Sequence, residues 1–175
     1  MNQSGCEEHA EFFRYQSELQ SEALLAYLET LREPVWECEL MRVALPAADL
    51  VSGAALEMYR WHFVLFHALY GLQPHFAGRG RYLFVHFMRT CVRELPAAGR
   101  CRYFDDDSAE FCGADCDAGA QFCAFHGRRG DELAVDMLSE RYFYLDPANF
   151  SAQAAENAEK FINGAWNLMH NQEEY

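Results

Sequence analysis

The sequence lacks the segments that would place the protein in or across a membrane. No stretch of the 175-residue chain approaches the roughly 18 consecutive apolar residues of a transmembrane helix. Residues 1–9 are polar and acidic, without the basic and apolar regions of a secretory signal. We therefore expect a cytoplasmic protein that has no membrane partner.

Basic residues are scarce, and Lys160 is the only lysine. The chain has 14 lysine and arginine residues against 27 aspartate and glutamate residues, which gives a formal net charge of -13. A strongly acidic protein repels phosphate backbones, so nucleic acid is a poor candidate partner.

Catalytic signatures are missing as well. We find no phosphate-binding loop, dinucleotide-binding fingerprint or nucleophile motif. His62 and His67 are five residues apart in an apolar segment, so they do not share a helix face and are expected to be core histidines. The run Asp105-Asp106-Asp107 lacks the spaced oxygen ligands of a calcium loop and is expected to be solvated. The sequence therefore predicts a protein that is not an enzyme.

The length and composition of the chain predict a single domain over residues 1–175. Half of the residues are hydrophobic (51%) and 15% are aromatic, which favours a well-packed core. Ser52 is a candidate N-cap, and Gly71 with Pro74 predicts a helix end. The predicted segments are a flexible tail at 1–10 and helices over 11–32, 35–44, 52–72 and 151–170.

Two apolar blocks suggest a family. The first is His62-Phe-Val-Leu-Phe-His-Ala-Leu-Tyr-Gly-Leu-Gln73, and the second spans 138–150. Together they resemble the N-terminal region of the bacterial DnaJ-related proteins, which often end in a J-domain. In the second block the matching residues are Tyr142, Tyr144, Leu145, Asp146, Asn149 and Phe150. Pro147 departs from the pattern, because the family usually has an aromatic residue there.

The resemblance covers about residues 20–95 and 132–170 and implies a chaperone-associated protein that binds a protein partner. The chain contains no His-Pro-Asp triplet, so it is not expected to stimulate a chaperone ATPase in the manner of a J-domain. The resemblance also favours a strand over a helix for 81–95, where the residue pattern fits both. Residues 142–144 are expected to be extended and to act as a structural clasp.

Three helices followed by a strand indicate an α+β, predominantly helical fold. We expect a winged-helix-like three-helix core with a small β-hairpin and a C-terminal packing helix, an analogy of fold alone. On a strand, Arg79, Arg81, Arg89 and Arg93 would share one face. Two interpretations stay open. The face is exposed to solvent and its positive charge offsets the negative charge of the rest of the protein, or it binds an acidic partner or RNA.

Residues 96–131 form a loop insertion rich in cysteine, glycine and aspartate, and they lie outside the resemblance. The chain has seven cysteines, an odd number that argues for free thiols or a metal site rather than a disulfide framework. The series Cys112-x3-Cys116-x6-Cys123-x2-His126 offers the thiolate and imidazole ligands that zinc prefers. Its spacing is not a standard one, and Cys101 can substitute for any of the four ligands.

Three interpretations of this loop stay open: a zinc site, free cysteines with no cofactor, or a redox pair such as Cys112 with Cys116. The sequence thus predicts a non-catalytic protein-interaction domain. The alternative is a zinc-binding regulatory or nucleic-acid-linked protein of winged-helix type.

Overall fold

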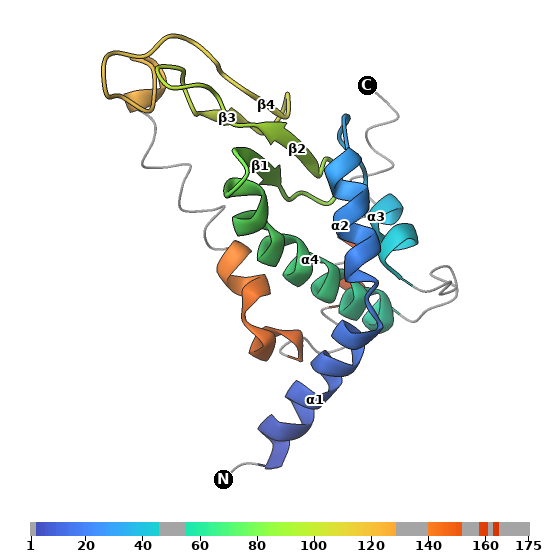
Figure 1. The fold of residues 1–175 in the computed structure, drawn as a ribbon. Coiled ribbons are helices and arrows are strands. Elements are labelled where there is room, and N and C mark those ends of the chain that lie inside the picture. The colour runs from blue at the N-terminus through green and yellow to red at the C-terminus, as the bar shows by residue number, and fades with distance from the viewer. Residues whose placement is uncertain (1–2, 46–54, 129–139, 152–157, 161–162, 165–175) are drawn as a thin grey trace.

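Helices dominate the computed structural model, which describes residues 3–45, 55–128, 140–151, 158–160 and 163–164 (Figure 1). The helices are α1 (Gln3–Glu18), α2 (Ser21–Thr30), α3 (Glu37–Ala44), α4 (Ala55–Ala77) and two 3-10 turns, η1 (His126–Arg128) and η2 (Pro147–Phe150). Two antiparallel hairpins accompany them: β1 (Arg81–Phe84) with β2 (Cys91–Glu94), and β3 (Phe104–Asp105) with β4 (Glu110–Phe111). The predicted α+β, predominantly helical class is confirmed.

Helix α4 is the central element of the core. It runs between α2 and α3 on one side and the 140–150 segment on the other (Figure 1). Its apolar residues are buried around the helix, including Phe63, Val64, Leu65 and Leu69, which are 0% exposed. An apolar sequence on all helix faces therefore corresponds to burial on all sides, as the sequence predicted.

Helix α4 continues past the predicted end at Gly71 and Pro74, and Pro74 lies inside it. The extra turn brings Phe76 into the core, where it is 0% exposed. Burying such a side chain contributes on the order of 2–3 kcal/mol, which offsets the helix hydrogen bond that proline cannot make. The helix ends at Ala77 instead, before Gly80, whose φ is 71°. The predicted N-cap, Ser52, lies outside the described residues.

The N-terminal helices differ from prediction at two places. Helix α1 begins at Gln3, so most of the predicted tail at 1–10 is helical. The predicted helix over 11–32 is broken between α1 and α2. At this break the Gln20 N–H donates to the Ala44 carbonyl at 2.7 Å, which ties the break to the end of α3.

The predicted strand over 81–95 is present, but as a hairpin. Arg81 pairs with Glu94 and Phe84 with Cys91. A further bridge joins Val35, between α2 and α3, to Thr90. Along the chain the elements are α2, the bridged segment at Val35, α3, α4 and the β1–β2 hairpin. This is the element order expected of a winged-helix-like core.

The expected common face of four arginines is wrong, because the chain reverses between β1 and β2. Arg81 lies opposite Glu94, whereas Arg93 lies opposite Tyr82. Neighbouring residues on a strand point to opposite faces, so Arg81 and Arg93 lie on different faces of the hairpin.

The 140–150 segment also departs from prediction. Residues 140–145 are helical rather than extended, and η2 follows. Asp146 caps the turn that Pro147 begins, since its side chain accepts a hydrogen bond from the Ala148 N–H at 3.0 Å. Of the predicted helix over 151–170, residues 151, 158–160 and 163–164 are described. Residues 158–160 and 163–164 are helical, whereas Ser151 is a bend at the end of η2.

Residues 96–128 project from the β1–β2 hairpin (Figure 1). The base of this projecting loop shares a small apolar cluster with the hairpin, in which Phe84, Cys91 and Ala109 are buried against Tyr82 and Phe104. Within the described part of the chain, no helix is long and apolar enough to cross a membrane.

Candidate metal centre

The projecting loop begins as one antiparallel ladder that extends beyond β3 and β4. The Cys112 N–H donates to the Tyr103 carbonyl at 2.8 Å, and the Cys101 N–H to the Ala114 carbonyl at 2.8 Å. The Cys116 N–H donates to the Gly99 carbonyl at 2.9 Å. These bonds keep the register of β3 and β4, so residues 99–105 face residues 110–116.

This ladder places cysteines on a common face. Cys101 faces Ala114, and Cys112 lies two residues before Ala114, so both sulfurs project from the same side. Gly113, between Cys112 and Ala114, has a φ of 62°, a left-handed conformation that interrupts the extended backbone of this strand. A second arm returns across the hairpin, where the Arg102 N–H donates to the Gln121 carbonyl at 2.9 Å.

The arm adds Cys123 and His126 to the cysteines of the hairpin. The ligand atoms of Cys101, Cys112, Cys123 and His126 all lie within 4.8 Å of one another. His126 Nδ1 is 3.5 Å from the Cys101 sulfur and 3.4 Å from the Cys123 sulfur. Around a tetrahedral zinc ion with Zn–S of about 2.3 Å and Zn–N of about 2.0 Å, sulfur and nitrogen lie about 3.5 Å apart. The geometry of these four residues therefore suits a tetrahedral metal ion.

The predicted ligand set was Cys112, Cys116, Cys123 and His126. The structure brings three of these together and adds Cys101, while Cys116 is not one of the four clustered residues. Cys101 is fully buried and Cys123 nearly so, whereas Cys112 is exposed. The sequence analysis named Cys101 as a substitute for any of the four predicted ligands. The ladder register explains its place in the cluster, because it puts Cys101 on the same face as Cys112.

Local backbone dipoles favour the thiolate at one ligand. The N–H groups of His126 and Phe125 point at the Cys123 sulfur and lower the pKa of its thiol. At Cys112, the Ala114 N–H acts in the same direction, but burial and the Cys101 and Cys123 thiols leave the pKa raised. A crowded set of thiols of this kind ionises together only when a cation neutralises the charge.

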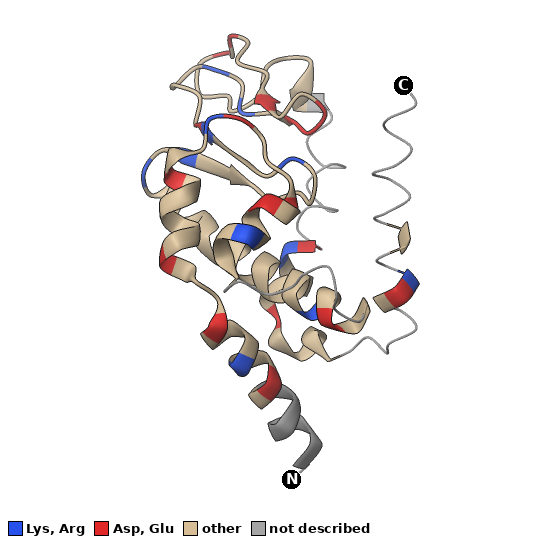
Figure 2. Cartoon of the chain, turned by 90° about the vertical axis from the view of Figure 1, so that its right-hand side faces the viewer, with Lys and Arg blue, Asp and Glu red and all other residues tan. Residues whose placement is uncertain are grey.

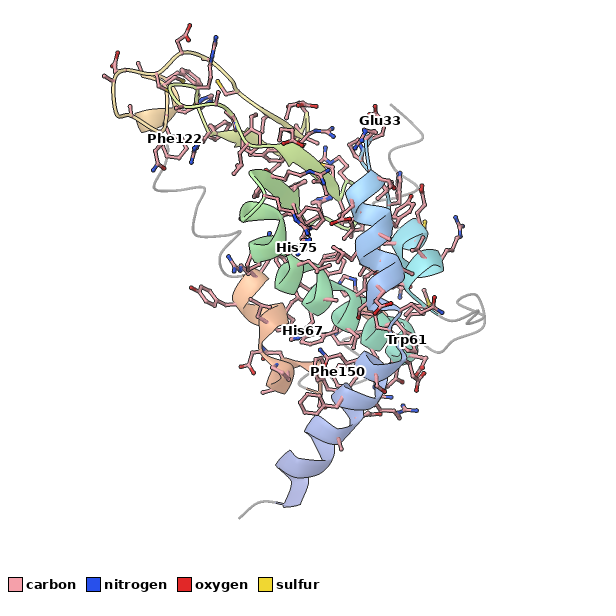
Figure 3. All side chains as sticks on the ribbon, in the orientation of Figure 1. Glu33, Trp61, His67, His75, Phe122 and Phe150 are labelled. Atoms are coloured by element: carbon pink, nitrogen blue, oxygen red, sulfur yellow. The ribbon has the colours of Figure 1, made fainter. Side chains whose placement is uncertain are left out.

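Aromatic rings surround the arm. Tyr103 stacks on the His126 ring with centroids 3.8 Å apart and planes 9° apart, which fixes the orientation of the imidazole. Phe122 and Phe125 stand on either side of Cys123 and are 38% and 66% exposed. Figure 3 shows Phe122 on the projecting loop, away from α1–α4.

The histidines of α4 form a second polar group inside the core. His62 Nδ1 is 2.8 Å from the Glu37 carboxylate, and its Nε2 is 2.7 Å from the Tyr144 hydroxyl. His67 Nδ1 lies 2.9 Å from the Tyr144 carbonyl oxygen and packs against Phe12 (Figure 3). Both histidines bond to their neighbours, as predicted, and they join the two apolar blocks; His62 is buried and His67 is partly buried.

The arginines that suggested a basic surface are paired with carboxylates of the same chain. The pairs are Arg79–Glu29, Arg81–Glu94, Arg89–Asp107, Arg93–Glu110 and Arg100–Asp115. Figure 2 shows basic and acidic positions interspersed along the ribbon. This pairing supports the solvated-face interpretation.

The acidic run in the projecting loop has a structural role. The Asp105 side chain accepts hydrogen bonds from the Asp107 and Ser108 N–H groups at 3.0 and 2.9 Å. Bonding to Ser108 lowers the pKa of Asp105 and closes the turn between β3 and β4.

Residues 20–111 match a family model whose description is DNA-J related protein. The match contains the 62–73 block and both hairpins. It also includes the start of the projecting loop with Cys101, which the resemblance had placed outside, and it stops before the 138–150 block. Comparison with curated proteins and with solved structures gave no significant match.

Proposed function

The chain belongs to the DNA-J related family, and from this premise we propose that it is a non-catalytic, cytoplasmic protein-interaction domain of a chaperone system. Its contact surface in this proposal is the projecting loop, held in shape by a zinc ion. The observation that carries the proposal is the pair of exposed aromatic side chains, Phe122 and Phe125, on the arm that also supplies Cys123 and His126.

Zinc is the metal that this ligand set favours. Three thiolates and one imidazole are soft or borderline donors, which suit zinc and disfavour magnesium or calcium. Zinc would contribute to folding here, because the apolar cluster at the base of the loop is small and contains no residue of the arm. With four protein ligands the site would be closed, as structural zinc sites are.

The aromatic pair gives the loop a binding surface. Exposed aromatic side chains supply much of the binding energy at protein interfaces, and they do so best on a rigid support. The metal would provide that support by fixing Cys123 and His126 on either side of Phe125. We propose that the partner presents apolar side chains and is a chaperone-system component, an assignment that rests on the family.

The absence of catalysis is part of the proposal. The Glu37–His62–Tyr144 chain resembles a catalytic relay in its order, but His62 is 4% exposed and sits among the aromatic rings of the core. In this proposal the Cys123–His126 pair would be occupied by the metal. Neither group offers a substrate a nucleophile with an open approach.

The alternative of a zinc-binding regulatory protein shares the metal site with this proposal. Its nucleic-acid version has less support, because the arginines are neutralised by neighbouring carboxylates and the chain carries a charge of -13. A recognition helix would need unpaired basic side chains. In α4, Arg60 is paired with Glu11 at 3.0 Å.

The metal is tested on purified protein by elemental analysis. We expect one zinc per chain in the wild type and a loss of zinc in C101S and C123S. C38S is the matched control, since Cys38 is an exposed cysteine on α3. Zinc-free wild-type protein that also fails to take up added zinc would contradict the metal site.

The binding surface is tested by affinity purification with mass spectrometry, comparing wild type with an F122S/F125S variant. F13S is the control, because Phe13 on α1 is also exposed, at 56%. We expect chaperone-system proteins to be enriched with wild type and F13S and lost with the double variant. Equal recovery with all three would show that the loop is not the contact surface.

A further inference from the structure

The projecting loop offers five thiol and imidazole groups for the four coordination positions of a zinc ion: the clustered Cys101, Cys112, Cys123 and His126, and in addition Cys116. We propose that Cys116 is a fifth metal donor that replaces His126, so that the centre also exists in a four-thiolate form. This inference rests on the proposed zinc site and extends it to a residue outside the Cys101, Cys112, Cys123 and His126 set.

The ladder register places Cys116 on the face of the hairpin that carries Cys101 and Cys112. Cys112 and Cys116 lie two residues on either side of Ala114, which faces Cys101. Alternate residues of a strand share a face, so all three sulfurs project from one side of the hairpin, with Cys101 in the middle.

The contacts of the Cys116 side chain agree with this placement. Its thiol interacts with the thiols of Cys101, Cys112 and Cys123, which are the three sulfurs of the centre. Its hydrogen bond to the Ala114 carbonyl is 3.9 Å long and therefore weak. Little holds this half-buried sulfur away from the metal position.

The hairpin and the arm supply different numbers of donor residues. The hairpin supplies Cys101, Cys112 and Cys116, while the arm supplies Cys123 and His126. If the His126 ring leaves the metal, the hairpin can provide the missing ligand without moving its backbone pairing. Zinc accepts three thiolates with one imidazole and also four thiolates, so both ligand sets are chemically sound.

Cobalt(II) absorption distinguishes the two forms, because the intensity of its thiolate charge-transfer band follows the number of bound sulfurs. The experiment uses reduced protein in a C6S/C38S background, with and without H126A, C116S or both. Circular dichroism confirms that each variant keeps its helices.

We expect three-thiolate intensity in the background protein and in C116S. In H126A the intensity should rise by about one third, from three sulfurs to four. The H126A/C116S double variant should return to the three-thiolate level and bind cobalt more weakly than H126A. A three-thiolate spectrum in H126A, with the double variant binding equally well, would overturn the fifth donor while leaving the metal site intact. A background protein that binds no cobalt would overturn the metal site itself, and this inference with it.

Discussion

At the residue scale, Tyr144 joins the two apolar blocks. Its hydroxyl bonds His62 and its carbonyl accepts from His67, so one residue of the second block is held at both ends by α4. Its ring also stacks on Tyr70 with planes 18° apart. Burial raises the pKa of Tyr144, which keeps the hydroxyl protonated and available as a donor.

Replacement of His62 by alanine should destabilise the domain strongly. The substitution leaves the Glu37 carboxylate and the Tyr144 hydroxyl without their partner inside the core and opens a cavity. We expect a loss of about 3 kcal/mol in the free energy of unfolding, measured by urea denaturation. H75A on the same helix is the control and should change stability by no more than about 0.5 kcal/mol. Similar losses in both variants would contradict the role given to His62.

Tyr59 should make stability depend on alkaline pH. Burial raises its pKa from 10.0 to about 12, so the folded state holds the phenolic proton more tightly than the unfolded state. The resulting stabilisation is present below pH 10 and is lost as the pH rises toward 12. The stability difference between wild type and Y59F should therefore fall by about 1 kcal/mol from pH 9 to pH 11. A difference that stays constant across this range would contradict the prediction.

At the scale of elements, the hairpin over 99–116 combines a regular ladder with one bend. The ladder sets which residues share a face, and Gly113 sets how close they come. An L-residue in the left-handed region costs about 1–2 kcal/mol, so glycine suits this position.

Replacement of Gly113 by alanine should weaken metal binding. The strain favours a straighter strand that moves Cys112 away from Cys101. We expect zinc affinity to fall about 10-fold, measured by competition with a chromophoric chelator. G127A is the matched control, because Gly127 has no positive φ and a Cβ there meets nothing within 4 Å. Equal affinity in the two variants would show that the bend is not needed.

At the scale of the whole molecule, the domain has two parts with different sources of order. The helices share one large apolar core, whereas the projecting loop has its own small cluster at the base. Removal of zinc should therefore loosen the loop and leave the helical core folded.

Hydrogen exchange with and without a chelator tests this separation. We expect the amides of 99–116 that bond across the ladder to lose protection, while those of α4 keep theirs. A change in α4 as large as in the loop would mean that the two parts fold as one unit. Unchanged exchange in both would mean that the metal does not order the loop.

Much of this architecture could be predicted from residue patterns. The apolar run over 62–73 indicated core positions on the predicted helix over 52–72. The strand at 81–95 was predicted in part, and three of the four residues predicted as metal ligands lie in the cluster of Cys101, Cys112, Cys123 and His126. The pattern did not show the reversal between Phe84 and Cys91, because β-branched and aromatic residues continue through it.

The sequence by itself determined which side chains are apolar, which segments favour a helix, and which side-chain atoms are suitable zinc ligands. These are local properties, set by side-chain chemistry and by spacing along the chain. The tertiary structure alone decided that Phe76 carries α4 past Pro74, that the arginines are paired, and that Cys101 lies with Cys112, Cys123 and His126. Each depends on contacts between residues far apart in sequence, or on a ladder register set by backbone hydrogen bonds. The spacing of residues along the chain predicts neither the long-range contacts nor the register of the ladder.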